Sequence, residues 1–207
     1  MNIIILGAGS TAISVTDIIL SSKIFNIKGY VGTETENQKF KNKTLYKDIP
    51  FLGGKESLKN IPKNISPGFV SAIGNRYFRE LAFYEAIKSD FIPVNIISNK
   101  SSIENSTNIN NGVIIFPHTY ISFNVNISEN TLIETNVVIE NNVSIGSNCN
   151  IESSSIVSGN VIIKKNVIVG KNSVIAPNIT VGKNQSIKPN SYVEKNLPDI
   201  EREEIIE

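Results

Sequence analysis

A branched aliphatic residue recurs at every sixth position along the second half of the chain, from residue 103 to residue 193. The members of this column are Ile103, Ile109, Ile115, Ile121, Ile127, Ile133, Ile139, Ile145, Ile151, Val157, Ile163, Val169, Ile175, Val181, Ile187 and Val193. A hexapeptide period is typical of a β-helix, in which three short strands and three turns make one coil of about 18 residues. One coil cannot bury its apolar face alone, so we expect a stack of roughly five coils with a continuous core.

A second column of small or β-branched residues follows four positions after each aliphatic residue. Its members are Thr107, Val113, Thr119, Val125, Thr131, Val137, Val143, Cys149, Ser155, Val161, Val167, Ser173 and Ile179. We expect these side chains to fill the interior, with the single cysteine packed there. Asparagine is frequent between the columns, and it tolerates the left-handed backbone that tight corners need. The asparagines expected at corners are Asn110, Asn111, Asn141, Asn142, Asn148, Asn166, Asn172 and Asn184.

The first half of the chain has a different pattern. An apolar run at 3–6 leads into Gly7-Ala8-Gly9-Ser10-Thr11-Ala12 and then into apolar positions at helical spacing. This order predicts a buried strand, a glycine-rich turn and a helix, the opening of a nucleotide-binding unit. A second strand is predicted at 27–32, followed by Thr33 and Glu34, where a dinucleotide-binding protein has its ribose-binding carboxylate. A purely structural glycine turn is the alternative.

The remaining elements of this part are less regular. The pattern predicts a polar loop at 35–50, a turn into a short helix at 51–58, a strand at 68–74, a helix and a last strand at 91–97. The helix is expected to bury a stripe made of Leu81, Ala82, Tyr84 and Ile87. Arg76 and Arg79 follow the strand at 68–74, where parallel sheets bind ligands, although surface salt bridges explain them equally well.

The sequence therefore predicts a small Rossmann-like parallel α/β domain at 1–98 and a left-handed parallel β-helix of hexapeptide repeats at 99–196. An acidic tail at 197–207 is expected to be helical or frayed. The 207 residues include 20 basic and 19 acidic ones, a balance that does not favour nucleic-acid binding. We expect a cytoplasmic protein without membrane insertion, because the first residues lack a signal-peptide pattern and no apolar run is long enough to span a bilayer.

The chain resembles the bacterial sugar acyltransferases related to sialic acid O-acetyltransferases and to UDP-amino-sugar N-acetyltransferases (NeuD/PglD-like). The resemblance rests on residues 4–9, 29–31, 51–53, 72–75 with Arg79, 132–135 and 139–140. It implies a homotrimer, a nucleotide sugar in the N-terminal domain, and acetyl-CoA between neighbouring β-helices, without a metal. The implied substrate-binding residues are Gly7, Gly9, Ser10, Thr33, Glu34, Gly74, Asn75 and Arg79. The implied acetyl-CoA contacts are Gly146, Gly159, Gly170 and Ala176.

The positions that the resemblance assigns to catalysis carry asparagine. Such enzymes have a histidine base after an Ile-Glu pair, then an acid, and a second histidine nine residues beyond the first. This chain has Asn141, Asn142 and Asn150 there, and an amide cannot accept a proton near neutral pH. The Gly-x-Pro-Ala ending that helps to wrap CoA is also missing. The only histidine, His118, is a weak substitute base, and Glu134 and Glu140 are the nearest carboxylates.

Three functions follow from this sequence. The first is acetyl-CoA-dependent acyl transfer to a nucleotide-linked amino sugar, with N-acylation favoured because an amine sheds its proton after attack more readily than a hydroxyl does. The second is a catalytically impaired trimer that binds a ligand or a partner protein. The third, an NAD-binding protein, rests on the glycine motif alone and is disfavoured by the displaced acid at Glu34.

Overall fold

The computed structural model describes residues 1–201 apart from 41–42, 63 and 65–66. The predicted conformation of the tail beyond residue 201 lies outside this part. The chain divides into two compact units, Met1–Asn99 and Lys100–Glu207.

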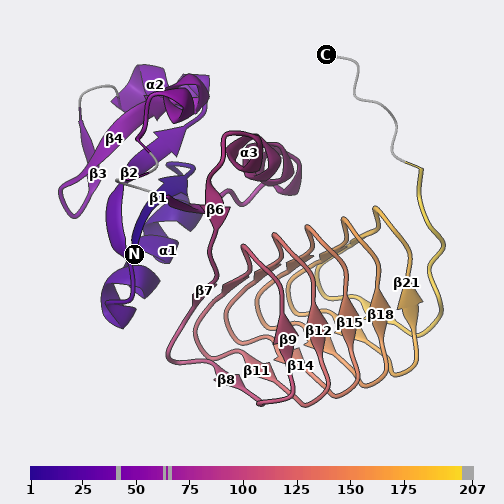
Figure 1. Ribbon diagram of the computed structural model, residues 1–207. Coiled ribbons are helices and arrows are strands. Elements are labelled where there is room, and N and C mark those ends of the chain that lie inside the picture. The colour runs from indigo at the N-terminus through magenta and orange to yellow at the C-terminus, as the bar shows by residue number, and fades with distance from the viewer. Residues whose placement is uncertain (41–42, 63, 65–66, 202–207) are drawn as a thin grey trace. The chain divides into compact units, whose positions relative to one another are not determined.

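The first unit is a mainly parallel sheet with helices (Figure 1). Its strands are β1 (Asn2–Leu6), β2 (Asn26–Gly32), β3 (Thr44–Tyr46), β4 (Ile49–Gly54), β5 (Gly68–Ser71), β6 (Ile92–Pro93) and β7 (Ile96–Ile97). Its helices are α1 (Ser10–Ser22), α2 (Glu34–Phe40), the 3₁₀ turn η1 (Lys55–Lys59) and α3 (Arg76–Lys88). The sheet order is β3-β4-β2-β1-β5-β6, and only the β3–β4 pair is antiparallel. The predicted Rossmann-like arrangement is confirmed.

The predicted loop at 35–50 is wrong in part, because it contains α2 and β3. Thr33 caps α2: its Oγ1 accepts the Glu36 N–H at 3.3 Å, while the Glu36 carboxylate accepts the Thr33 N–H at 2.8 Å. This reciprocal pair is a capping box, a helix-start signal that the sequence does contain as Thr-x-x-Glu.

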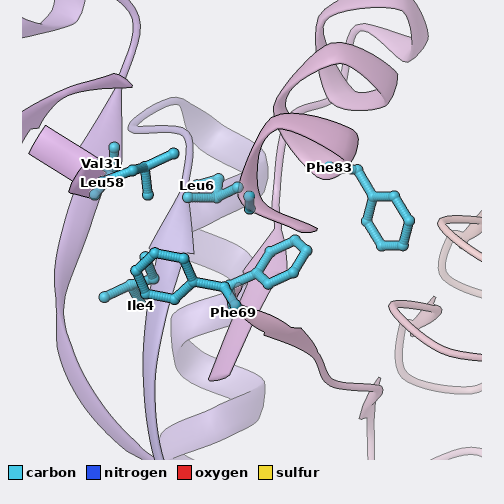
Figure 2. Close-up of a cluster of buried hydrophobic side chains, with 8 residues drawn as sticks. Ile4, Leu6, Val31, Leu58, Phe69 and Phe83 are labelled. Atoms are coloured by element: carbon cyan, nitrogen blue, oxygen red, sulfur yellow. The ribbon is translucent and has the colours of Figure 1, made fainter. Parts of the chain in front are cut away.

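The predicted apolar stripe of α3 is wrong at three of its four positions, because Leu81, Tyr84 and Ile87 are exposed and only Ala82 packs against the core. The helix instead buries Phe83 and Ala86 in the core cluster of the unit (Figure 2). That cluster consists of Ile4, Leu6, Val31, Leu58, Phe69, Phe83, Ala86 and Phe91. The Phe69 and Phe83 rings lie 5.5 Å apart in a tilted arrangement, which fixes α3 against β5.

The second unit is a stack of coils whose strands form three parallel sheets (Figure 1). The β13 sheet contains β10 (Ile114–Ile115), β13 (Leu132–Ile133), β16 (Asn150–Ile151), β19 (Ile168–Val169) and β22 (Ser186–Ile187). The β14 sheet contains β8 (Ser102–Ile103), β11 (Tyr120–Ile121), β14 (Val138–Ile139), β17 (Ile156–Val157), β20 (Val174–Ile175) and β23 (Tyr192–Val193). The β15 sheet contains β9 (Asn108–Ile109), β12 (Asn126–Ile127), β15 (Ser144–Ile145), β18 (Ile162–Ile163) and β21 (Thr180–Val181). Each strand pairs with the strand 18 residues away, so the predicted β-helix is confirmed.

The second column is buried as predicted from Val113 to Ile179, and its polar members are satisfied inside the coil. The hydroxyls of Thr119, Thr131 and Ser155 each donate to a carbonyl oxygen 15 residues further on, at 2.9–3.0 Å. The Cys149 Sγ makes the same contact with Lys164 O at 3.2 Å. These bonds remove the cost of burying hydroxyls in an apolar core.

Asparagine occupies most corners in the left-handed conformation, which confirms the prediction at Asn142, Asn148, Asn166, Asn172 and Asn184. Asn110, Asn111 and Asn141 do not have positive φ, and Gly112 takes the left-handed position after Asn110 and Asn111. The corner residues with positive φ are His118, Asn124, Asn130, Asn136, Asn142, Asn148, Ser154, Asn160, Asn166, Asn172, Asn178, Asn184 and Asn190. Their side chains form ladders between coils. In the buried ladder Asn130, Asn148, Asn166 and Asn184 are linked by Nδ2–H···Oδ1 bonds of 2.9–3.2 Å.

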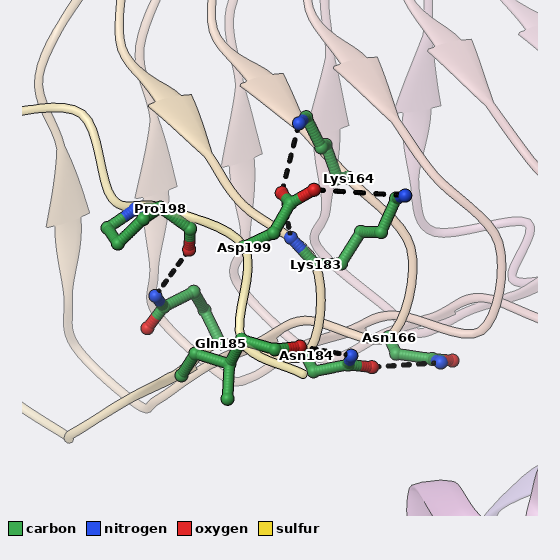
Figure 3. A network of polar contacts seen from close by, with 8 residues as sticks. Lys164, Asn166, Lys183, Asn184, Gln185, Pro198 and Asp199 are labelled. Atoms are coloured by element: carbon green, nitrogen blue, oxygen red, sulfur yellow. Dashed lines mark hydrogen bonds and ion pairs between the residues drawn. The ribbon is translucent and has the colours of Figure 1, made fainter. Parts of the chain in front are cut away.

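The segment after β23 closes the last coil (Figure 3). Leu197 pairs with Val181, and Asp199 Oδ1 accepts hydrogen bonds from the Lys164 Nζ and from the Lys183 N–H, each at 2.9 Å. The Asn184 amide at the end of the buried ladder donates to the Ile200 carbonyl oxygen at 2.6 Å. This segment therefore satisfies groups that the last coil would otherwise leave open.

Candidate functional site

A cavity of about 200 Å³ lies at the carboxyl ends of β1 and β5. The chain runs from β1 to β2 and β4 on one side and returns to β5 on the other, so the cavity is at the switch point where open α/β sheets bind ligands. Its lining residues are Gly7, Gly9, Ser10, Thr11, Thr33, Glu36, Ala72, Ile73, Gly74 and Phe78. Five of the sequence-derived substrate residues line it: Gly7, Gly9, Ser10, Thr33 and Gly74.

The two glycines of the first turn have different reasons to be glycine. Gly7 has φ +107°, and a Cβ there would lie 2.8 Å from Ala72 O, so the fold itself requires glycine. A Cβ on Gly9 would meet no heavy atom within 4 Å. The fold does not need a glycine at position 9, and its absent side chain leaves the cavity open.

The carboxylate at this cavity belongs to Glu36. Its Oε1 accepts the Ala8 N–H of the glycine turn at 3.1 Å, and its Oε2 accepts the Thr33 Oγ1–H at 3.1 Å. Glu34, the predicted acid, is the first residue of α2, and its side chain lies outside the described structure. Sequence reasoning also missed the lining residues Thr11, Ala72, Ile73 and Phe78. Phe78 is 52% exposed at the start of α3 and had no distinguishing signal in the sequence.

Asn75 and Arg79, which were predicted to bind the substrate, both make structural contacts at the start of α3. Asn75 is the N-cap of α3, and its Oδ1 accepts the Tyr77 and Phe78 N–H groups at 3.0 and 3.2 Å. Arg79 is 1% exposed, and its Nη1 donates to Ile73 O at 3.2 Å. Both residues hold the β5–α3 turn that forms one wall of the cavity.

In the β-helix, two of the three catalytic-type positions, Asn141 and Asn142, lie on one edge, which we call the Asn141 edge. It consists of the turns at 122–124, 140–142, 158–160 and 176–178, between the β14 and β15 sheets. Asn142 is a corner residue of an exposed ladder, bonded to Asn124 at 2.8 Å and to Asn160 at 2.9 Å. Its amide is committed to the scaffold, whereas no such ladder bond involves the neighbouring Asn141.

The other predicted site residues do not join this edge within one chain. Asn150 lies on β16 and is 5% exposed. His118 is an exposed corner residue of the edge between the β13 and β14 sheets, which we call the His118 edge. Glu140 accepts the Gly159 N–H at 2.8 Å, and Glu134 accepts the Ser153 N–H and hydroxyl at 3.1 and 2.7 Å. These carboxylates tie successive coils together.

The four predicted acetyl-CoA contacts lie on three different edges. Only Gly159 and Ala176 share the edge of Asn141. A Cβ on Gly146 would lie 2.6 Å from Lys165 N, and one on Gly170 would lie 2.5 Å from Ile187 O, so coil stacking explains both glycines. At Gly159 the nearest atom would be Asn141 Oδ1 at 3.5 Å, an ordinary contact. Gly159 therefore opens space beside Asn141 that the fold does not require.

Comparison with protein families finds a match within the first unit. Residues 2–86 match the PglD N-terminal domain. The sequence-derived resemblance is thus confirmed for this domain. No curated protein matches the chain.

Solved structures share the fold of both units, at identities that establish fold alone. PerB from Caulobacter crescentus, in complex with CoA and GDP-perosamine, is 20% identical with a TM-score of 0.88, over 97% of this chain and 92% of that one. The acetyltransferase domain of PglB from Neisseria gonorrhoeae, in complex with acetyl coenzyme A, is 15% identical with a TM-score of 0.86, over 96% and 93%. WeeI from Acinetobacter baumannii is 16% identical with a TM-score of 0.67, over 96% and 94%.

None of the helices in the described residues has the length and apolar character needed to cross a membrane.

Proposed function

We propose that this protein transfers an acetyl group from acetyl-CoA to the amino group of a nucleotide-linked amino sugar. The observation that carries the proposal is the match of nearly the whole fold to PerB, which is described with CoA and GDP-perosamine bound. The PglD N-terminal domain and its switch-point cavity support a nucleotide-sugar site in the first unit. The space at Gly159 supports ligand approach to the Asn141 edge.

The functional unit in this proposal is a homotrimer built on the β14 sheet. After Ser102, every outward residue of this sheet is apolar: Tyr120, Val138, Ile156, Val174 and Tyr192. Tyr120 and Tyr192 are 40% and 65% exposed. The outward residues of the β15 sheet are mostly polar: Asn108, Asn126, Ser144, Ile162 and Thr180. A continuous apolar face on a soluble β-helix favours association with another surface.

A threefold axis facing the β14 sheet would bring unlike edges together. The Asn141 and His118 edges bound this sheet, so each Asn141 edge would meet the His118 edge of a neighbouring protomer. If the threefold axis runs parallel to the long axis of the β-helix, Asn141 lies at the level of the neighbour's Asn136. It then lies one coil, about 4.8 Å, above the neighbour's His118. His118 could then act on the site of Asn141 only across the interface.

The chemistry that fits these residues is amine acylation. The acceptor amine attacks the thioester carbon, the thiolate of CoA leaves, and the proton on the new amide nitrogen passes to water. Asn141 hydrogen-bonds and orients the amine but cannot take its proton. A general base contributes about 10²–10⁴ in rate, so its loss slows a positioning enzyme without abolishing it.

Replacement of a histidine by asparagine is compatible with ligand binding in a protein of this fold. A histidine-to-asparagine variant of the perosamine N-acetyltransferase from Caulobacter crescentus is described in complex with CoA and GDP-perosamine. By analogy, we expect this chain to bind both ligands and to transfer slowly.

The first experiment is calorimetric titration with acetyl-CoA, followed by thiol release in the presence of UDP- and GDP-linked amino sugars. We expect acetyl-CoA to bind and thiol release to require an amino sugar. Gly159→Ala should abolish thiol release. Gly53→Ala in the first unit is no suitable control, because Gly53 has φ +126° and a side chain there would strain the backbone. Ser144→Ala, an exposed change on the β15 sheet, is the matched control. No acetyl-CoA binding at millimolar concentration would refute the transferase.

The second candidate is a catalytically impaired trimer that binds ligands or a partner protein. The scaffold roles of Asn142 and the burial of Asn150 favour it, because two of the three catalytic-type positions serve the fold. Asn141→His separates the two candidates. A rise of about 10²-fold in thiol release over a measurable wild-type rate supports the slow enzyme. If only the Asn141→His variant releases thiol and the wild type does not, the catalytically impaired trimer is supported.

A further inference from the structure

One aromatic side chain lies on the Asn141 edge beside the proposed transfer site. Phe123 is 54% exposed and is the middle residue of the turn at 122–124, one coil before the turn that contains Asn141. The corresponding turn residue recurs every six positions from 105 to 195, a stretch that the structure describes throughout, and every other member is polar, glycine or proline. A single exposed hydrophobic residue is ordinary on a protein surface, but this one lies in the same column as Asn141.

The backbone holds Phe123 next to Asn141 in the stack of coils. The Phe123 carbonyl oxygen accepts the Asn142 N–H at 3.2 Å, and the Asn124 side-chain amide donates to Asn142 Oδ1 at 2.8 Å. Neighbouring coils of such a stack lie about 4.8 Å apart. A ring exposed at position 123 is therefore within reach of a ligand that contacts Asn141.

The other side of Asn141 is open. Gly159 is the middle residue of the next turn, and a Cβ there would meet no heavy atom closer than Asn141 Oδ1 at 3.5 Å. Gly159 and Ala176, the two predicted acetyl-CoA contacts on this edge, both belong to turns that follow Asn141 in the stack. An acyl donor on that side leaves the acceptor the side of Phe123.

We propose, building on the proposed function, that Phe123 forms the floor of the acceptor site and packs against the C–H face of the amino sugar while Asn141 hydrogen-bonds its amine. A pyranose ring carries polar groups around its rim and C–H groups on its faces, so an apolar ring and one amide can fix its orientation together. Phe123 takes no part in proton transfer. It positions the amine and disfavours a sugar that presents an axial hydroxyl to the ring.

The test uses the full-length protein with UDP- and GDP-linked amino sugars and with UDP and GDP, which have no sugar. Phe123→Ala should raise the KM for the amino-sugar nucleotide about tenfold, or its Kd by the same factor where turnover is too slow to measure. The affinities for the nucleoside diphosphate and for acetyl-CoA should not change, because neither ligand contacts the ring. Phe123→Tyr keeps the ring and should retain most of the wild-type affinity.

A matched variant and a rival arrangement sharpen the test. Ile162→Ala removes another large exposed side chain, 48% exposed on the β15 sheet, and should leave the acceptor KM unchanged. The melting temperature of Phe123→Ala without ligand should stay within about 2 °C of wild type, as for other surface substitutions. In the proposed trimer the neighbour's His118 lies level with Phe123, so the rival arrangement has the ring filling the groove against the neighbour. Trimer dissociation with an unchanged acceptor KM, or faster thiol release by Phe123→Ala, would show that arrangement and overturn the inference.

The outcomes also distinguish this inference from the proposed function. If wild type and Phe123→Ala bind and acetylate the amino sugar equally well, the inference falls and the transferase stands. If neither acetyl-CoA nor any of the amino-sugar nucleotides binds to the wild type, the transferase and the inference both fall.

Discussion

Replacing Gly146 and Gly159 by alanine tests most sharply which turn glycines of the β-helix are needed for coil stacking and which leave space for a ligand. Both are turn glycines outside the left-handed region, so backbone strain does not distinguish their replacement by alanine. In Gly146→Ala the new Cβ lies 2.6 Å from Lys165 N and 2.7 Å from Lys164 C. The obstructing atoms are backbone of the next coil, which moves only if strand pairing is disturbed.

Overpacking of this kind costs about 1–3 kcal/mol. For a chain of this size each kcal/mol lowers the melting temperature by about 2–4 °C, so Gly146→Ala should melt roughly 2–12 °C below wild type. In Gly159→Ala the nearest atom is 3.5 Å away. The loss of glycine from the unfolded chain then stabilises the protein by about 0.4–1 kcal/mol.

The assay is thermal unfolding of both variants by calorimetry, at one protein concentration and without ligand. Gly146→Ala should melt lower than wild type, and Gly159→Ala should melt at or slightly above it while losing thiol release. Equal destabilisation of the two variants would refute the reasoning, because it would mean that Gly159 also serves coil stacking.

Three further predictions concern the ladders, the closing segment and the apolar face. Asn148→Ala should destabilise the protein by about 1–3 kcal/mol more than Asn142→Ala in denaturant unfolding, because both remove a left-handed asparagine but only the first leaves buried ladder partners unsatisfied; equal losses would contradict this. Lys183 N–H and the Lys164 ammonium hold the pKa of Asp199 below its ordinary value, so this carboxylate stabilises the fold above the unfolded-state pKa, and the contribution disappears as the pH falls through the lower folded-state pKa. The melting temperature of Asp199→Asn should therefore lie slightly below that of wild type at neutral pH and converge with it in acid, and a constant difference would argue against the linkage. Ile156→Asp should give a folded monomer in sedimentation, whereas a persistent trimer would exclude the β14 sheet as the interface.

The sequence by itself determined the β-helix, because its signal repeats. Each aliphatic residue specifies an inward position, and its phase agrees with every neighbour in the column. Asparagine at the corners follows for the same reason, since every hexapeptide needs one left-handed residue. The 18-residue coil even fixes which turns share an edge, so the separation of Gly146 and Gly170 from the edge of Asn141 was available from the spacing.

Tertiary structure decided the features that depend on contacts between distant segments. The apolar positions of α3 suggested one buried face. In the structure, however, α3 packs Phe83 against the Phe69 ring, and Leu81 is exposed to solvent. The cap residue Thr33 and the acid at position 36 are visible in the sequence. That the same carboxylate also takes the Ala8 N–H, 28 residues away, depends on how α2 returns to the glycine turn. The sequence of each repeat determines its own periodic packing, whereas the hydrogen-bond partner of a single polar group is determined only when the chain has folded.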